Sequence, residues 1–154
     1  MANDTQIKID TGGILAALDR LPGELRKSAL SAVLRAGATP IRKAAKINAR
    51  KSRDSGLLEK SISLRVKNGS ARVGPARGIR QQVTRTDKRT GRKYTEIADP
   101  NNYSHLVEYG TSHSAPKPFI RPAIDSASGD VLSAMATGLD KHLTRVVARL
   151  RSRR

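Results

Sequence analysis

The sequence predicts an α+β protein in which a small antiparallel sheet, with one projecting hairpin, packs against a long kinked amino-terminal helix and a carboxy-terminal helix. Long stretches near both ends place apolar residues at helical spacing. Between them, alternating apolar and polar residues flank the pair Asn68-Gly69, the strongest short-range signal for a hairpin. At 154 residues, the chain fits a single domain that spans residues 1–154.

The amino-terminal third is expected to be mainly helical. Residues 6–10 alternate polar and apolar side chains, which predicts a short edge strand before the first helix. Helical spacing runs from Ile14 to Leu21 and, after Pro22-Gly23, from Glu24 to about Arg50. Pro40 should kink the longer helix or mark a join, because proline lacks the amide donor of a helical hydrogen bond. The apolar stripe of the longer helix comprises Leu30, Val33, Leu34, Gly37, Ile41, Ala44 and Ala45.

The polar surface of this longer helix is almost entirely basic, in a chain whose formal net charge is +17. Glu24 is the only acidic residue in residues 20–53. A solvated helix face is the simplest interpretation. However, Arg42, Lys46 and Arg50 are spaced four residues apart, and like charges at this spacing repel each other on a helix. These three residues are therefore candidate contacts to DNA or to an acidic partner.

The middle of the chain predicts a tight hairpin. Residues 55–60 are expected to form a short helical turn, and residues 61–67 alternate polar and apolar side chains as a strand does. Asn-Gly suits a type I′ turn, because both central residues of that turn need positive φ. The two-residue loop sets Arg65 opposite Arg72 on the outer face, where opposed like charges are unfavourable unless they meet water or negative charge. The pairs expected on the buried face are Val66 with Ala71 and Leu64 with Val73.

A second, longer hairpin is expected over residues 79–97, with its tip around residues 87–92. Its strands lack alternating large apolar residues, which indicates a basic arm, at about residues 77–97, that projects from the body. The candidate contacts that it offers to DNA or an acidic partner are Arg85, Lys88, Arg89, Arg92 and Lys93. A solvated loop and a binding arm are both compatible with this composition.

The carboxy-terminal part is expected to hold a short helix or turn over residues 101–110, a loop over residues 111–118 and a long helix from Pro122. The apolar stripe of the long helix, expected to pack within the subunit, comprises Leu132, Met135, Leu139, Leu143, Val146 and Leu150. The chain then ends in a basic tail, residues 149–154, that is expected to fray.

Composition and motifs argue against catalysis. The chain has no cysteine, and His105, His113 and His142 lack the spacing of a metal site. There is no glycine-rich phosphate loop with its lysine, and the acidic residues are scattered rather than clustered for divalent metal. We therefore expect no enzyme activity and no cofactor. The first ten residues do not resemble a signal peptide, and no apolar run approaches a transmembrane length, so a cytosolic protein without a membrane partner is expected.

A non-specific basic nucleic-acid-binding accessory protein is the alternative class. The excess of positive charge calls for an acidic target, and DNA is one candidate. Aromatic residues make up only 3% of the chain, so stacking platforms for single strands are hard to build. No zinc-finger or clear helix-turn-helix pattern is present. Any DNA contact would therefore be to phosphates, and it would weaken steeply with salt.

One segment carries a recognisable pattern in two parts. The first part begins with an aromatic residue, followed further along by an apolar pair, a glutamate, a second aromatic residue and Gly-Thr. These residues are Tyr103, Leu106, Val107, Glu108, Tyr109, Gly110 and Thr111. The second part is a Pro-Phe-aliphatic-Arg-Pro run that contains Pro118, Phe119, Arg121 and Pro122. The pattern resembles the tail-component family of long-tailed bacteriophages labelled "gene product ten-like". The specific part of the resemblance covers Tyr103 to Ile124.

The same residues have a physical interpretation as an assembly brace. Gly110 allows the chain to turn with positive φ, and the two prolines stiffen the chain on either side of Phe119, which is placed as an anchor. Glu108 is expected to accept hydrogen bonds from loop amides or to pair with Arg121. The segment is therefore expected to hold the loop against the start of the final helix.

The resemblance implies a structural virion protein of the phage neck, a single tail-completion-like domain that forms a hexameric ring joining the DNA-filled head to the tail. The implied partners are further copies of the chain, the neighbouring connector, stopper and tail terminator or tail tube proteins, and genomic DNA through non-specific contacts. A tail terminator at the top of the tail tube is the alternative role. The implied location is the neck of the virion, after assembly in the host cytoplasm.

Overall fold

The computed structural model describes residues 11–51 and 56–152. In chain order its elements are α1 (Gly12–Asp19), α2 (Gly23–Lys51), α3 (Leu57–Ser61), β1 (Ile62–Lys67), β2 (Ser70–Pro75), β3 (Gln81–Thr86), β4 (Lys93–Ala98), α4 (Pro100–Tyr109) and α5 (Arg121–Arg151). The predicted α+β class is confirmed, with long helices near both ends and antiparallel hairpins between them. The edge strand predicted for residues 6–10 lies outside the described residues.

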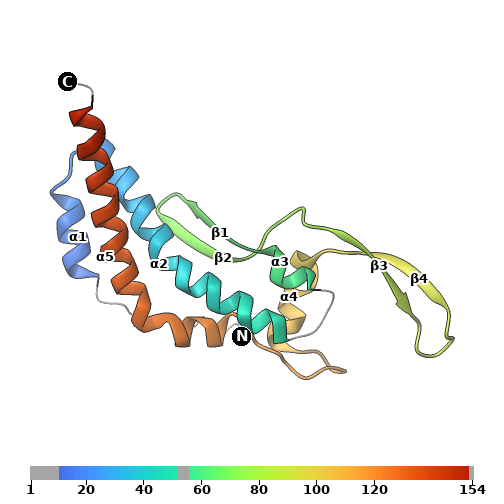
Figure 1. Ribbon diagram of the computed structural model, residues 1–154. Coiled ribbons are helices and arrows are strands. Elements are labelled where there is room, and N and C mark those ends of the chain that lie inside the picture. Colours follow the sequence, from blue (N-terminus) through green and yellow to red (C-terminus); the bar gives the residue numbers. More distant parts are fainter. Residues whose placement is uncertain (1–10, 52–55, 153–154) are drawn as a thin grey trace.

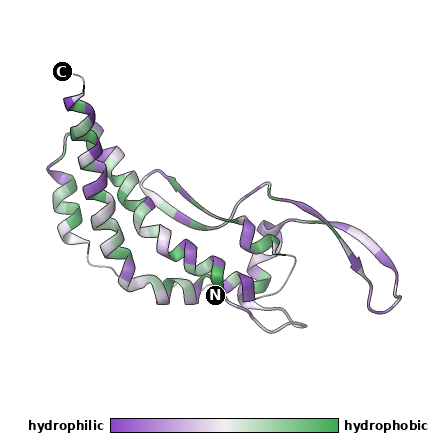
Figure 2. Cartoon of the chain, viewed as in Figure 1, coloured by the Kyte–Doolittle hydropathy of each residue, from purple (hydrophilic) through white to green (hydrophobic). Residues whose placement is uncertain are grey.

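Helix α2 is the centre of the fold. Helices α1 and α5 and the β1–β2 hairpin all pack on it, with α5 and the hairpin along different sides (Figure 1). Helices α3 and α4 lie at the junction from which the β3–β4 hairpin extends away from the body (Figure 1). Strands β3 and β4 pack chiefly on each other. The arm is also mostly hydrophilic, whereas apolar residues are spread along the helices (Figure 2).

The predicted apolar stripe of α2 is the face on which the rest of the protein packs. Its buried residues include Val33, Gly37 and Ala45. The helix runs without a break through Pro40, so this proline does not mark a join. A proline inside a helix costs one hydrogen bond and about 3 kcal/mol. Packing on both sides of Pro40 offsets this cost. Ala38 is buried within one turn before Pro40, and Ala45 is buried within two turns after it.

Small residues let α2 and α5 approach closely. A Cβ atom added to Gly138 on α5 would lie 2.4 Å from the Cβ of Ala36 on α2. A Cβ added to Gly37 would lie 2.6 Å from the Cγ of Met135. The separation of two packed helices depends on the side chains at their contact. Glycine at these two positions therefore brings the helices together in the middle of the body.

The buried apolar residues form two clusters at opposite ends of α2. The first joins α2 to the sheet and to the start of α5, and comprises Ala45, Ala49, Leu58, Ile62, Phe119 and Ala123. The second joins α1, α2 and the middle of α5, and comprises Leu18, Ala29, Val33 and Leu139. The predicted brace residue Phe119 belongs to the first cluster.

Helix α5 packs within the subunit over its middle, as predicted, but not over its last turns. Met135, Leu139 and Leu143 contribute to the second cluster. Leu150, by contrast, is 60% exposed, because α5 extends beyond the elements that cover it. The helix continues to Arg151, so residues 149–151 of the expected frayed tail are helical. Arginines in the last turn of a helix interact favourably with its negative end.

The two hairpins are separate two-stranded sheets. The predicted register of the first is confirmed, since Leu64 pairs with Val73 and Arg65 pairs with Arg72. Its turn residue Asn68 has φ +50° and Gly69 has φ +69°, as a type I′ turn requires. The second hairpin pairs Gln81–Thr86 with Lys93–Ala98, which places its tip at residues 87–92 as predicted.

Candidate assembly surfaces

Glu108 caps the start of α5 from the last turn of α4. Its Oε2 atom accepts hydrogen bonds from the backbone amides of Phe119 at 2.7 Å and Ile120 at 3.0 Å, and its Oε1 atom accepts one from the amide of Arg121 at 3.0 Å. The first amides of a helix have no partner within the helix, and its positive end favours a carboxylate. Glu108 itself is only 8% exposed. The hydrogen bonds predicted between Glu108 and loop amides are confirmed.

Gly110 ends α4 and starts the loop that returns to Glu108. Its φ is +78°, and a Cβ atom there would lie 2.8 Å from the backbone nitrogen of Pro116 and 2.9 Å from the carbonyl oxygen of Ser114. Only glycine avoids both the strain of positive φ and this overlap. The amide of Lys117 donates to the carbonyl of Val107 at 2.8 Å, which holds the returning loop beside α4.

Phe119 anchors this loop in the first core cluster, where it is 2% exposed. It shares the cluster with residues from α2, α3, β1 and α5, namely Ala45, Ala49, Leu58, Ile62 and Ala123. Tyr103 and Val107 of the motif pack against the same cluster from α4. The motif therefore braces the subunit internally, and one aromatic side chain ties together five elements of the chain.

Other motif residues point outward. Leu106 and Tyr109 are exposed on α4, and Arg121 places its guanidinium carbon 4.9 Å from the centroid of the Tyr109 ring. A cation over an aromatic face at this distance is attracted to it. Thr111, Pro118 and Pro122 are exposed as well. Leu106 and Tyr109 thus present apolar surface next to the brace, where a partner can bury it.

The tip of the arm is fixed by Asp87. Its Oδ1 atom accepts hydrogen bonds from the amides of Arg89 at 2.7 Å and Thr90 at 3.0 Å. The carbonyl of Asp87 accepts from the amide of Gly91 at 2.8 Å, and its own amide donates to the carbonyl of Arg92 at 2.9 Å. The amides of Thr90 and Arg89 stabilise the charged carboxylate, so they lower the pKa of Asp87 below its usual value. The tip is therefore held in one shape by local hydrogen bonds alone.

The arm presents free cations at its tip and a paired one on its strand. Arg85 lies on β3 and pairs with Glu96 across the ladder. Lys88, Arg89, Arg92 and Lys93 are exposed, and no ion pair among the described residues involves them. The four cations nearest the tip remain available for an acidic partner.

The base of the arm is tied to the body at Asp99. Its Oδ1 atom accepts a hydrogen bond from the amide of Asn101 at 3.0 Å and so caps the start of α4. Its Oδ2 atom accepts one from Nε of Arg80 at 3.1 Å. One carboxylate therefore links the strand end of the arm to the helix that carries Glu108.

The cations predicted on α2 do not form one free stripe. Arg50 makes a two-pronged pair with Glu59 of α3, with Nε to Oε2 at 3.0 Å and Nη2 to Oε1 at 2.5 Å. The hydrogen bond from Arg50 is the main cause that lowers the pKa of Glu59. Arg42 and Lys46 are half-buried. The Arg50–Glu59 contacts tie α2 to α3. Arg42 and Lys46 are less exposed than the cations of the arm.

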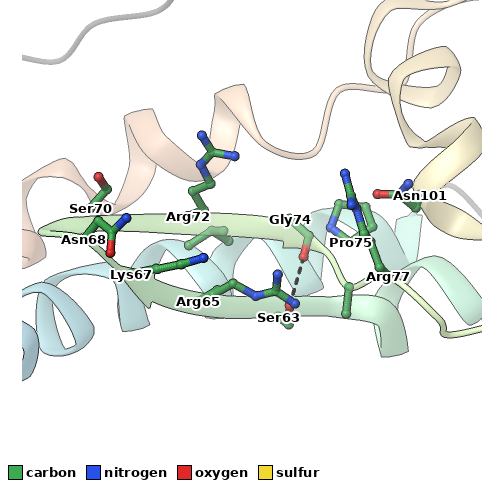
Figure 3. Close-up of a pocket in the computed structure, with 12 residues that line it drawn as sticks. Ser63, Arg65, Lys67, Asn68, Ser70, Arg72, Gly74, Pro75, Arg77 and Asn101 are labelled. Atoms are coloured by element: carbon green, nitrogen blue, oxygen red, sulfur yellow. Dashed lines mark hydrogen bonds between the residues drawn. The ribbon is translucent and has the colours of Figure 1, made fainter.

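A basic groove lies on the outer face of β1–β2. The sequence pattern predicted only part of it. Arg65 and Arg72 stand opposite each other, as the register predicts, and Lys67 and Arg77 extend the row of cations (Figure 3). The groove has a volume of about 620 Å³, and no acidic residue lines it. The alternation of residues along β1 places Lys67 on the same face as Arg65, so the sequence could have predicted its position. Arg77 joins the groove only because the chain turns after β2.

The described residues contain no group of histidine and acidic side chains arranged to hold a metal ion. Among the described helices, none is both long enough and apolar enough to cross a membrane.

Comparison with known protein families gives a match. A protein-family model described as "Bacteriophage HK97-gp10, putative tail-component" matches residues 13–110, which is more than half of the chain. The match runs from α1 to the end of α4, so it includes Glu108 and Gly110 but stops before Phe119. No curated protein and no solved structure shows a significant match.

Proposed function

Because the chain belongs to the HK97-gp10-like family of bacteriophage tail components, we propose that it forms a ring in the phage neck that joins the DNA-filled head to the tail. Membership of this family makes the chain a structural component of the virion tail that interacts with other phage structural proteins. The six-membered ring, the neck position and the head-tail joining role are the further steps of the proposal. A purely structural role without catalysis is part of it.

The arm is the observation that carries this proposal. Strands β3 and β4 pack chiefly on each other, and the arm extends away from the body (Figure 1). A hairpin that buries so little surface in its own subunit is only marginally stable by itself. Its shape is nevertheless fixed at the tip by Asp87 and at the base by Asp99. An ordered projection of this kind supports contact with another subunit or a neighbouring protein.

The brace supports the same role from the inside. It fixes the direction of α4 relative to α5 through Glu108 and Phe119. The base of the arm is tied to α4 at Asp99. A ring needs every subunit to present its contacts at the same angle, so a rigid link between the body and the arm suits an assembly protein.

The proposal is tested with particles that carry a shortened arm. Replacing residues 82–97 with a short Gly-Ser turn removes the arm and leaves both core clusters intact. We expect filled heads and tails of normal length that fail to join, counted by electron microscopy. As a matched control, Arg20→Ser with Lys27→Ser removes exposed charge elsewhere and should leave joining unchanged.

Two other outcomes would contradict this proposal in different ways. Tails of uncontrolled length would indicate the tail terminator role, because a protein that caps a growing tube limits its length. Normal joining by the shortened-arm protein would show that the arm is dispensable for joining.

The variant Arg89→Ser with Arg92→Ser separates the charge of the tip from the shape of the arm. We expect this variant to reduce joining less than removal of the arm does.

The nucleic-acid-binding alternative is tested on the purified subunit. Its cations on the groove and the arm would contact phosphates, and such binding weakens steeply with salt. Under the proposed neck role, we expect duplex binding by the isolated subunit to be weak near physiological salt. Tight binding with a steep dependence on salt concentration would favour the alternative.

A further inference from the structure

The basic groove on β1–β2 lacks an acidic partner within its own subunit. Arg65, Lys67, Arg72 and Arg77 take part in no ion pair among the described residues. Arg65 and Arg72 are directly paired across the ladder, where like charges are unfavourable, and their side chains point apart (Figure 3). An anionic surface placed between them would relieve this repulsion. No aromatic residue lines the groove, so it offers no platform for stacking bases.

Most acidic residues of the described chain are already used inside the subunit. Asp19, Glu59, Glu96 and Asp99 pair with arginines, and Asp87 and Glu108 accept backbone amides. The exception of interest is a row on α5 that consists of Asp125, Asp130 and Asp140, here called the acidic face. All three are exposed, and none belongs to an ion pair among the described residues.

The stretch of α5 that carries the acidic face contains no basic residue up to Asp140, which Lys141 follows. Between Pro122 and Asp140, α5 carries no lysine or arginine. On an ideal helix with 3.6 residues per turn, the three acids would fall within about 140° of each other, and α5 bends along its length (Figure 1). Short exposed side chains, namely Ser126, Ser133 and Thr137, flank the acids, together with the exposed Leu132. Long arginine side chains of a partner can reach the carboxylates over the short ones.

The spacing of charges on the two surfaces is similar. Asp125 and Asp130 lie about 7.5 Å apart along the helix axis, at a rise of 1.5 Å per residue. Arg65 and Lys67 lie about 6.7 Å apart along β1. Both surfaces are made of exposed residues, and α5 and the hairpin pack along different sides of α2 (Figure 1). A subunit therefore offers the groove and the acidic face to two different neighbours.

We propose that the basic groove of one subunit binds the acidic face of α5 on the next subunit. The inference rests on the proposed ring and names the contact that builds it. Because the two surfaces are different, the contact is head-to-tail, and such a contact closes into a ring when the rotation between neighbours allows it. The occupant of the groove is thus a second copy of this chain.

Charge reversal on each surface tests this contact with the full chain. Variant one carries Arg65→Glu and Arg72→Glu in the groove, and variant two carries Asp125→Lys and Asp130→Lys on the acidic face. All four residues are exposed, so folding should persist, which circular dichroism checks. At low ionic strength, sedimentation should show an assembled wild-type protein and at least about a hundredfold weaker association of each variant alone.

Mixing the two variants gives the decisive result. In the mixture, the reversed groove of variant one faces the reversed acidic face of variant two, and the unreversed surfaces also match. We expect assembly to return in the mixture and in a single chain that carries all four substitutions. The chain has no cysteine, so Arg65→Cys with Asp130→Cys should also give disulfide-linked oligomers through this contact. The matched control Arg20→Glu with Lys27→Glu should assemble like the wild type.

Several outcomes would overturn this contact without touching the proposed neck role. Assembly of both variants alone, or no recovery in the mixture, would exclude it, as would a wild-type protein that stays monomeric at low ionic strength. If variant one still assembles but loses duplex binding, the groove is a nucleic-acid site.

The opposite result separates the two proposals. If assembly is lost and recovered as expected, but the assembly-deficient variants still join heads to tails normally, then this contact is sustained and the neck role is refuted.

Discussion

The brace and the arm both turn the chain at a glycine with positive φ, but different forces hold the two turns. Gly110 of the brace has φ +78°, and a Cβ atom there would overlap the backbone of Ser114 and Pro116. Gly91 of the arm has φ +69°, and a Cβ atom there would meet nothing within 4 Å. The turn of the brace is thus fixed by close packing as well as by hydrogen bonds, whereas the turn of the arm is fixed by its own hydrogen bonds alone.

This difference separates stability from assembly in one small protein. The brace buries Phe119 and the carboxylate of Glu108, so changes there act on the folding of the whole body. The arm buries little, with Tyr94 47% exposed and Ile97 also exposed on β4, so changes there act mainly on what the arm contacts. The same basic chain therefore contains one region that holds the subunit together and one that is free to meet partners.

The largest expected effect comes from emptying the centre of the brace. Phe119→Ala should lower the free energy of unfolding by about 3–5 kcal/mol, because it leaves a cavity where α2, α3, β1 and α5 meet. Urea unfolding followed by circular dichroism measures this loss. The matched aromatic substitution in the arm, Tyr94→Ala, should cost less than about 1 kcal/mol, since its side chain is half exposed. Similar losses for the two variants would remove the distinction between brace and arm.

An intermediate effect is expected when the two turning glycines are compared directly. Gly110→Ala combines the strain of positive φ with backbone overlap, and it should cost about 2 kcal/mol or more. Gly91→Ala has the strain alone, so it should cost about 1 kcal/mol or less of global stability. Thermal unfolding of both variants beside the wild type makes the comparison. A larger loss for Gly91→Ala would mean that the arm is coupled to the core.

The smallest effect is a local one at the tip of the arm. The amides of Thr90 and Arg89 lower the pKa of Asp87, so its contribution is present above its unfolded pKa of about 3.9 and is lost as pH falls through the folded pKa. Amide hydrogen exchange at Arg89 and Thr90 should therefore accelerate as the solution is acidified below about pH 4, beyond the intrinsic change in rate. Asp87→Ala should show fast exchange already at pH 6. Unchanged protection in this variant would show that the carboxylate does not order the tip.

Local signals in the sequence predicted most of the elements and their turns. Asn68-Gly69 determined the register of the first hairpin down to the opposition of Arg65 and Arg72, because a two-residue turn allows only one pairing. The tip of the arm followed from the turn-forming residues around Gly91. For Pro40 the sequence left a kink and a join open. The structure excludes the join, because packing on α5 and on the β1–β2 hairpin holds α2 together as one helix.

The candidate site was predictable only in part, because its chemistry depends on residues distant in sequence. Glu108 was expected to accept loop amides, but the choice of the Phe119, Ile120 and Arg121 amides required the loop to return against α4. Because Arg50 lies on a basic stripe of the helix, it was expected to contact DNA or an acidic partner. The structure shows instead that Glu59 of α3 lies within hydrogen-bond distance of its guanidinium.

By itself, the sequence determined the α+β class, the order of the helices and hairpins, the register of β1–β2 and the resemblance to a phage tail component. These properties depend on periodicity, on turn residues and on a short motif, all of which are local. Only the tertiary structure decided which charges are neutralised inside the subunit and which remain for partners. That division depends on distances between α2, α3, the hairpins and α5, and such distances arise only when the apolar faces pack together.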